Sequence, residues 1–256
     1  MSELTVCADA ELAARAACAQ IARALKEARA ARGVAHLALS GGRTPGRTYE
    51  LLSPALESWR AVELWFADER CVPAEDEQSN YRLVAQTLLE GTRIAPGQVH
   101  RMEGELGPTE GARRYGQALR ERLDASADAP PALDVVLLGV GPDGHVASLF
   151  PGHPALSATA QQLCVGISDS PKPPAQRITL SLPLLRSARA VILLASGPEK
   201  ARAVAGALAQ PTPKLPASLL CAERLTVIVD EDAAAALPDA TRRARAGVHP
   251  TRRGDV

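Results

Sequence analysis

The stretch "GVGPDGH" at 139–145 places two chemically reactive side chains, Asp143 and His145, in a loop that directly follows an apolar run. Gly141 and Gly144 allow the tight turn that would point both side chains into one cleft. An imidazole titrates near neutral pH, and a carboxylate close to it can orient or polarise the ring, which suits general acid–base catalysis. We therefore predict catalytic roles for His145 and Asp143.

The same loop allows two other interpretations. Its Gly-x-Gly-x-x-Gly pattern is the one that brings a helix N-terminus against the pyrophosphate of a dinucleotide, but that pattern ordinarily belongs to the first βαβ unit of a chain. Here it lies past the middle, Pro142 removes a backbone donor, and Asp143 places negative charge where phosphates would lie. The second interpretation is that His145 only caps the next helix. We favour catalysis over both and expect no cofactor.

A glycine-rich turn after the apolar run 36–40 predicts an anion-binding loop. Ser40, Gly41 and Gly42 allow several backbone N–H groups to face one point, and the start of the next helix adds its dipole. Arg43 follows directly and adds a positive charge. A tight turn that needs glycine for a positive φ is the alternative. The loop lacks the Lys-Ser/Thr ending of a nucleotide P-loop, so it does not indicate ATP.

Charged side chains also follow other apolar runs. Asp68 comes directly after 62–67, where a buried carboxylate needs a partner, and Arg70 can supply one or reach a ligand phosphate. Lys200 falls in the first turn of an expected helix, where a lysine is unfavourable unless an anion is bound. Arg177 is a further candidate anion contact, with an ordinary arginine at a strand edge as the alternative. We add Asp68 to the catalytic candidates and the other three to the binding residues.

The elements that must position these residues alternate along the chain. Apolar, β-branched-rich runs lie at 36–40, 62–67, 133–139, 162–168, 190–196 and 225–230, and helices are expected at 10–32, 80–89 and 199–209. Continuous apolar runs separated by helices are typical of a parallel sheet covered on both faces, so we predict a three-layer α/β/α fold with a mostly parallel sheet. Ligands of such sheets bind beyond the carboxyl ends of the strands, where the candidate residues fall.

Composition excludes several classes of function. The chain has 256 residues, 46% of them hydrophobic and 23% charged, which is enough for a substantial core. Its net charge is zero and only 3% of the residues are aromatic, which argues against nucleic acid as a partner. Five scattered cysteines without a C-x-x-C spacing predict neither a disulfide framework nor a zinc site, and we expect no metal.

The chain organisation predicts one domain over 1–240, because no linker or internal repeat interrupts it. The segment 241–256 is basic and has no apolar periodicity, so we expect a flexible tail, with a ligand-binding arm as the alternative. No run approaches the roughly 20 apolar residues of a membrane helix and the start lacks signal-peptide features, which favours a cytoplasmic protein away from membranes. We expect a monomer or a small homo-oligomer.

Five stretches together resemble the 6-phosphogluconolactonase family, part of the glucosamine-6-phosphate isomerase/6-phosphogluconolactonase superfamily. They are "LSGGRTP" from 39, "FADERCVP" from 66 with "SN" at 79, "GVGPDGHVASLFPG" from 139, "PPAQRITLSLP" from 173 and "SGPEK" from 196. The resemblance spans nearly the whole chain. It implies a Rossmann-like fold shared with glucosamine-6-phosphate deaminases and ribose-5-phosphate isomerases, hydrolysis of 6-phospho-D-glucono-1,5-lactone in the oxidative pentose phosphate pathway, and no metal.

The resemblance also implies roles for single residues. His145 would be the catalytic residue of "DGH", with Asp143 beside it, while the "SGG" loop, Arg70 and Lys200 would line the phosphate and substrate pocket. The family most often has threonine directly after this histidine. Val146 stands there in this chain, so no hydroxyl is available at that position.

Two competing functions stay open at this point. A glucosamine-6-phosphate deaminase would use Asp68 to move a proton between C2 and C1, but the deaminases that this chain is similar to carry an aromatic residue after the Asp-Glu pair, where "DERCVP" has Arg70. A sugar-phosphate-sensing domain of a transcription regulator would keep the anion loop and lose the catalytic pair. The presence of both Asp143 and His145, without a helix-turn-helix segment or basic face, argues against a sensor.

Overall fold

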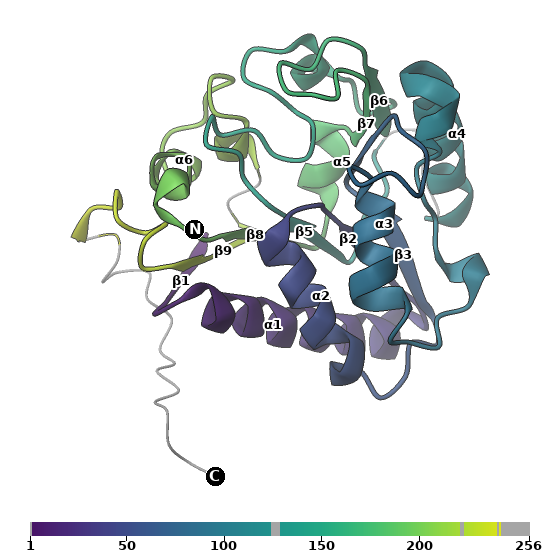
Figure 1. Cartoon of the computed structure of the whole chain (residues 1–256), viewed down its shortest axis with the longest axis horizontal. Coiled ribbons are helices and arrows are strands. Elements are labelled where there is room, and N and C mark those ends of the chain that lie inside the picture. The colour runs from purple at the N-terminus through teal and green to yellow at the C-terminus, as the bar shows by residue number, and fades with distance from the viewer. Residues whose placement is uncertain (1, 124–128, 221–222, 240, 242–256) are drawn as a thin grey trace.

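The computed structural model describes residues 2–123, 129–220, 223–239 and 241. Its larger sheet has six strands in the order β1-β9-β8-β5-β2-β3, and every neighbouring pair is parallel (Figure 1). The strands are β1 (Glu3–Cys7), β2 (Ala35–Leu39), β3 (Val62–Phe66), β5 (Val135–Leu138), β8 (Ala190–Ala195) and β9 (Leu225–Asp230). The carboxyl ends of all six strands therefore lie along one edge of the sheet.

Helices cover both faces of this sheet, which gives the predicted three layers. In Figure 1, α1 and α2 lie on one side of it and α5 and α6 on the other. The helices are α1 (Ala10–Arg32), α2 (Arg43–Ala55), α3 (Asn80–Val84), α4 (Gly107–Arg122), α5 (Leu182–Ser187) and α6 (Ala201–Ala207). The helix predicted over 80–89 is α3 followed by a π-helical turn, Ala85–Leu89, and that over 199–209 is a 3-10 turn, Pro198–Lys200, followed by α6.

The longest helix, α1, shows how local sequence sets its limits. Asp9 caps the start by accepting a hydrogen bond from the backbone N–H of Leu12, at 2.8 Å. Gly33 ends the helix with φ 78°, a left-handed conformation that glycine adopts without strain. Small and branched side chains form the buried face between them, at Ala13, Ala17, Ile21 and Leu25. Alanines on that face allow the helix to approach the sheet closely.

The central strands are buried along almost their whole length, which explains their continuous apolar runs. Every residue of β2, β5 and β9 is buried. Strands β2 and β3 pair in register from Ala35 with Val62 to Leu39 with Phe66. The chain therefore leaves the two strands side by side, and the segments that begin at Ser40 and Asp68 start next to each other.

A second, antiparallel sheet of three strands corrects one sequence prediction. It has the order β4-β7-β6, made of β4 (Asp68–Arg70), β7 (Arg177–Leu180) and β6 (Cys164–Ile167). The run at 162–168 does contain a strand, but its predicted place in the parallel sheet is wrong. This strand packs on α4 instead, and a Cβ on Gly166 would lie 2.3 Å from the carbonyl oxygen of Pro108. The close approach needs glycine, a signal that an apolar pattern does not contain.

Two further sequence predictions concern the C-terminal segment and membrane-spanning helices. The predicted flexible tail, 241–256, lies outside the described residues apart from Thr241, so the division at 240 stays a prediction. Of the helices that the structure describes, none combines the length and the apolar character that crossing a membrane requires.

Candidate active site

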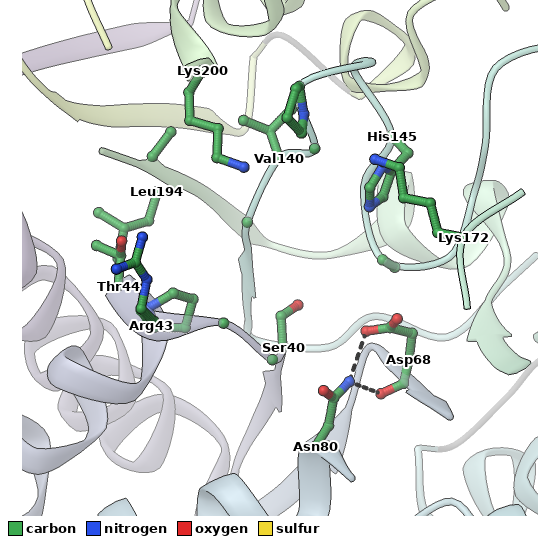
Figure 2. Close-up of a pocket in the computed structure, with 18 of the residues that line it drawn as sticks. Ser40, Arg43, Thr44, Asp68, Asn80, Val140, His145, Lys172, Leu194 and Lys200 are labelled. Atoms are coloured by element: carbon green, nitrogen blue, oxygen red, sulfur yellow. Dashed lines mark hydrogen bonds between the residues drawn. The ribbon is translucent and has the colours of Figure 1, made fainter. Parts of the chain in front are cut away.

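A cavity of about 450 Å³ opens beyond the carboxyl ends of β2, β3, β5 and β8, at the edge of the sheet where the candidate residues were expected (Figure 2). Its polar and charged lining includes Ser40, Arg43, Thr44, Asp68, Arg70, Asn80, His145, Lys172, Arg177, Ser196, Glu199 and Lys200, and the glycines Gly41 and Gly42 also line it. Of the residues predicted from the sequence, Asp143 is the one that does not line the cavity itself. It contacts His145 instead.

The pairing of His145 with Asp143 depends on the glycines of their loop. The imidazole Nδ1 lies 2.6 Å from Oδ1 of Asp143. A Cβ on Gly141 would lie 2.0 Å from that Nδ1 and 2.5 Å from that Oδ1, and Gly144 has φ 84°. Any side chain at 141 would therefore separate the pair. The His145 ring also packs against Phe150, with 4.8 Å between ring centroids, which fixes its plane.

The electrostatics of this pair favour a neutral imidazole beside an ionised carboxylate. Burial lowers the pKa of His145 and outweighs the opposite effect of Asp143. Burial raises the pKa of Asp143, but hydrogen bonds from Lys172, at 2.9 Å, and from His145 bring it down to about 2. A carboxylate on Nδ1 selects the tautomer with its proton there. The lone pair of Nε2 is then free to accept a proton.

Asp68 lies buried in the floor of the cavity, and its hydrogen bonds fix its orientation. Oδ2 accepts from Ser148 Oγ at 2.7 Å, and Oδ1 accepts from Asn80 Nδ2 at 3.2 Å. The same amide donates to the Asp68 carbonyl oxygen at 2.8 Å, as Figure 2 shows. Arg177 Nη1 is 3.9 Å from Oδ2. The carboxylate thus faces the cavity with a donor on each oxygen.

The adjacent Glu69 has a structural position rather than one on the cavity wall. Its two oxygens accept hydrogen bonds from the backbone N–H groups of Asn80, at 2.7 Å, and Tyr81, at 2.8 Å, and from Ser79 Oγ at 3.1 Å. Burial raises the pKa of Glu69, although these backbone hydrogen bonds lower it. A carboxylate at the amino end of α3 also interacts favourably with the helix dipole. Glu69 thereby holds Asn80 in place against Asp68.

The glycine-rich turn presents the open amino end of α2 to the cavity. Tyr49 anchors it, since its hydroxyl accepts from the Ser40 N–H at 2.9 Å and donates to the Ser40 carbonyl at 2.7 Å. Gly42 is the N-cap of α2, with φ 121° and no side-chain cap. The Ser40 hydroxyl is buried and has no hydrogen-bond partner among the described residues. Free donors at a helix start suit an anion.

Cationic side chains lie on two sides of the cavity. Figure 2 places Arg43 and Lys200 on one side, with His145 and Lys172 on the other. Burial lowers the pKa of Lys200, whereas Glu199 raises it. The sequence predicted Lys200 in the first turn of a helix. It ends a 3-10 turn and is the residue directly before α6.

Arg70 and Arg177, two of the three arginines predicted to bind substrate, differ in how far protein groups already engage them. Arg70 donates through Nη1 to the carbonyl of Gln78, while its buried Nε has no partner among the described residues. Arg177 is 5% exposed and donates to the carbonyls of Pro173, at 3.0 Å, and Pro174, at 3.1 Å. Arg70 therefore keeps a free donor for a ligand, whereas Arg177 mainly holds the loop before β7.

Some lining residues were missed by the sequence analysis. Lys172 lies in the loop between β6 and β7, 29 positions from the aspartate that it contacts, and nothing local signals the direction of its side chain. Ser196 directly follows β8, and its buried hydroxyl has no partner among the described residues. Val146 is completely buried, so its side chain packs in the core beside the catalytic candidates.

Within the described ranges, no group of three or more His, Cys, Asp or Glu side chains is arranged to hold a metal ion.

Comparisons with known proteins bear on the family and the fold of the chain. A family model described as glucosamine-6-phosphate isomerases/6-phosphogluconolactonase matches residues 8–229. A 6-phosphogluconolactonase of Streptomyces coelicolor is 42% identical over 216 residues, which cover 80% of this chain and 82% of that protein. The structure of a 6-phosphogluconolactonase from Trypanosoma cruzi has a TM-score of 0.81 at 30% identity, covering 92% of this chain and 96% of that one.

A more distant structure bears on the fold alone. A monomeric glucosamine-6-phosphate deaminase has a TM-score of 0.76 at 24% identity, over 91% of this chain and 99% of that one. The α/β/α fold predicted from the sequence, of the type shared with these deaminases, is confirmed.

Proposed function

The chain belongs to the glucosamine-6-phosphate isomerase/6-phosphogluconolactonase family, and we propose that it hydrolyses 6-phospho-D-glucono-1,5-lactone to 6-phospho-D-gluconate with His145 as the general base. It is an enzyme of the carboxylic ester hydrolase class. The observation that carries the proposal is the position of His145, paired with Asp143 on one side of a cavity whose other side has Arg43 and Lys200. A volume of about 450 Å³ suits one sugar phosphate.

The phosphate group is expected at the amino end of α2. The backbone N–H groups at the start of that helix, the free Ser40 hydroxyl, Arg43 and Lys200 together supply donors and positive charge for a dianion. With the phosphate held there, the lactone ring extends across the cavity toward His145. Binding energy from the phosphate then positions the reacting carbon without taking part in the chemistry.

The reaction itself needs a base, an acid and a partner for developing negative charge. Neutral His145 takes a proton from water as the water oxygen bonds to C1 of the lactone. When the tetrahedral intermediate collapses, the bond from C1 to the ring oxygen breaks and the imidazolium returns its proton to that oxygen. Asp143 stabilises the imidazolium formed in between.

Negative charge gathers on the carbonyl oxygen in the transition state, so a donor must face it. Arg70 is our candidate, because its buried Nε has no partner among the described residues and the side chain lines the cavity. Asp68, the third residue predicted to be catalytic, faces the same space. Its two oxygens already accept hydrogen bonds from Ser148 and Asn80. That engagement does not favour the deaminase alternative, which needs Asp68 as a free base.

The proposed substrate also bears on location and assembly. A phosphate dianion crosses a bilayer only at high cost, so the enzyme must work in the compartment where its substrate forms, and we propose the cytoplasm. We also propose that the chain acts as a monomer or a small homo-oligomer, and its net charge of zero does not favour nucleic acid as a partner.

The test is an assay of lactone loss. The lactone is generated in place from glucose 6-phosphate and followed with purified protein, with a blank that lacks the protein, and with His145→Ala. The blank is essential because the lactone opens spontaneously. We expect acceleration by the wild type and none by the variant. Absence of acceleration by the wild type, with release of ammonia from glucosamine 6-phosphate, would assign the chain to the deaminases instead.

A further inference from the structure

Lys172 belongs to a compact cluster of three charged or titratable groups at the edge of the cavity. Its Nζ lies 2.9 Å from Oδ1 of Asp143 and 3.3 Å from Nδ1 of His145. The same Oδ1 is 2.6 Å from that Nδ1. Oδ1 of Asp143 therefore accepts hydrogen bonds from both the ammonium and the imidazole. The ammonium lies beside Nδ1, and Nε2 on the other side of the ring stays free.

Partly buried contacts hold the backbone of this lysine in position. Ser170 Oγ accepts from the Lys172 N–H at 3.2 Å and donates to the Lys172 carbonyl at 2.8 Å. The carbonyl of Pro173 accepts from Arg177 Nη2 at 3.0 Å. Arg177 in turn lies over the ring of Phe150, with 5.7 Å from its guanidinium carbon to the centroid. The loop that carries Lys172 is thus fixed to the same aromatic ring that packs on the catalytic imidazole.

We propose that Lys172 is a positioning residue that keeps His145 unprotonated between turnovers and favours the return of its proton to the leaving oxygen. The proposal rests on the proposed function. A carboxylate beside an imidazole favours the imidazolium form, whereas a cation 3.3 Å from Nδ1 opposes it. Burial and Lys172 together allow Asp143 to orient the imidazole and select its tautomer without holding it in the charged form.

Among the charged groups that face His145, Lys172 adds to the effect of burial and opposes the effect of the two carboxylates. Asp143 is on the same loop, Asp68 is on β4, and both raise the pKa of His145, whereas Lys172 on the β6–β7 loop lowers it. Burial also lowers this pKa and is the largest effect. During catalysis the imidazolium and the ammonium share one carboxylate oxygen. That crowding of positive charge makes the imidazolium a better acid toward the ring oxygen.

The test measures the titration of His145 directly, by NMR of protein with labelled histidine and without substrate. The chain has five histidines, and the signal missing from His145→Ala assigns this one. We expect the midpoint of His145 to rise by about one pH unit in Lys172→Met, because a like charge a few ångströms away is removed. Lys172→Arg should restore a midpoint close to that of the wild type. Lys26→Met, at an exposed position on α1, is the matched control and should leave the midpoint unchanged.

The pH profile of kcat/KM adds a second readout. Its acid limb should move upward with the NMR midpoint in Lys172→Met, so that activity well below both midpoints falls by about tenfold relative to the plateau of the same variant. A folded Lys172→Met protein with an unchanged His145 midpoint would overturn the proposal. If that variant does not fold, Lys172→Gln is the second neutral replacement, judged by the same criterion. Because the titration needs no substrate, its result is independent of whether the lactone is the true substrate.

Discussion

The hydroxyl of Ser148 donates a hydrogen bond of 2.7 Å to the carboxylate of Asp68, 80 positions earlier in the chain. Both side chains are buried, and the bond ties β4 to the segment that follows His145. Arg177 Nη1 approaches the same hydroxyl at 3.4 Å. Ser148 therefore connects Asp68 of β4 with Arg177, which holds the loop that carries Lys172.

Replacing Ser148 with alanine should reduce stability more than it reduces turnover. The change removes a donor from a buried carboxylate, so we expect the free energy of unfolding to fall by about 1–3 kcal/mol. Denaturant unfolding measures this quantity. Ser157→Ala, at an exposed serine in a 3-10 turn, is the matched control. Equal stability of the two variants would show that the hydrogen bond contributes little.

Gly141→Ala should impair catalysis while the fold persists. A Cβ at this position would lie 2.0 Å from Nδ1 of His145, so the imidazole must move away from Asp143. A displacement of about 1 Å in a catalytic group costs roughly 100-fold in rate, and we expect a loss of kcat of that order.

The control for Gly141→Ala is Gly97→Ala, because a Cβ on Gly97 meets no atom within 4 Å. Steady-state kinetics at saturating lactone gives kcat, and the far-ultraviolet circular dichroism spectrum shows whether each variant is folded. Full activity of a folded Gly141→Ala protein would contradict the close packing of this loop.

One physical reason explains why the sequence predicted the large sheet and most of the residues at the edge where the cavity lies. Strands buried on both faces, such as β5 and β9, must be continuous apolar runs, and their carboxyl ends mark where ligands bind. The loops at Ser40 and His145 follow from that rule. The rule also placed the run at 162–168 in the wrong sheet, because a short strand that packs on α4 has a similar apolar composition.

Contacts between distant loops could not be predicted from local pattern. Lys172 approaches Asp143 only because the β6–β7 loop folds back over the cavity, and Arg177 fixes that loop through backbone carbonyls. Asn80 stands at the start of the helix expected over 80–89, and nothing in that position signals its contact with Asp68. Such pairings depend on the three-dimensional arrangement, and neither side chain signals the other in the sequence.

The pH dependence of kcat/KM should show an acid limb with a midpoint below 6.5, the ordinary pKa of histidine. Burial lowers the pKa of His145, and only the neutral ring accepts a proton from water, so activity should fall as pH drops through this midpoint. Asp143 raises this pKa, so Asp143→Asn should move the midpoint further down. The plateau should also fall, on the order of 100-fold, because an amide no longer selects the Nδ1–H tautomer. An acid limb above 6.5 in the wild type would contradict a buried neutral base.

Lys200→Met should weaken recognition of the phosphate and leave the chemistry of the lactone unaffected. Lys200 lies on the same side of the cavity as Arg43 and across from His145, so its charge should act mainly on the phosphate rather than on the base. We expect kcat/KM for the phosphorylated lactone to fall by about tenfold or more, where each tenfold corresponds to about 1.4 kcal/mol. Glucono-1,5-lactone without phosphate should be a much poorer substrate of the wild type, and Lys200→Met should hydrolyse it no more slowly than the wild type does.

The comparison of the two substrates is a double-mutant cycle, because one change removes the Lys200 ammonium and the other removes the substrate phosphate. The cycle measures the interaction energy between these two groups. Competitive inhibition by inorganic phosphate gives an independent measure, and its inhibition constant should rise in Lys200→Met by a similar factor. The exposed Lys26→Met variant serves again as the control for loss of one positive charge. An equal drop in kcat/KM for both lactones would mean that Lys200 acts at the reacting carbon, and the phosphate would then have to bind elsewhere in the cavity.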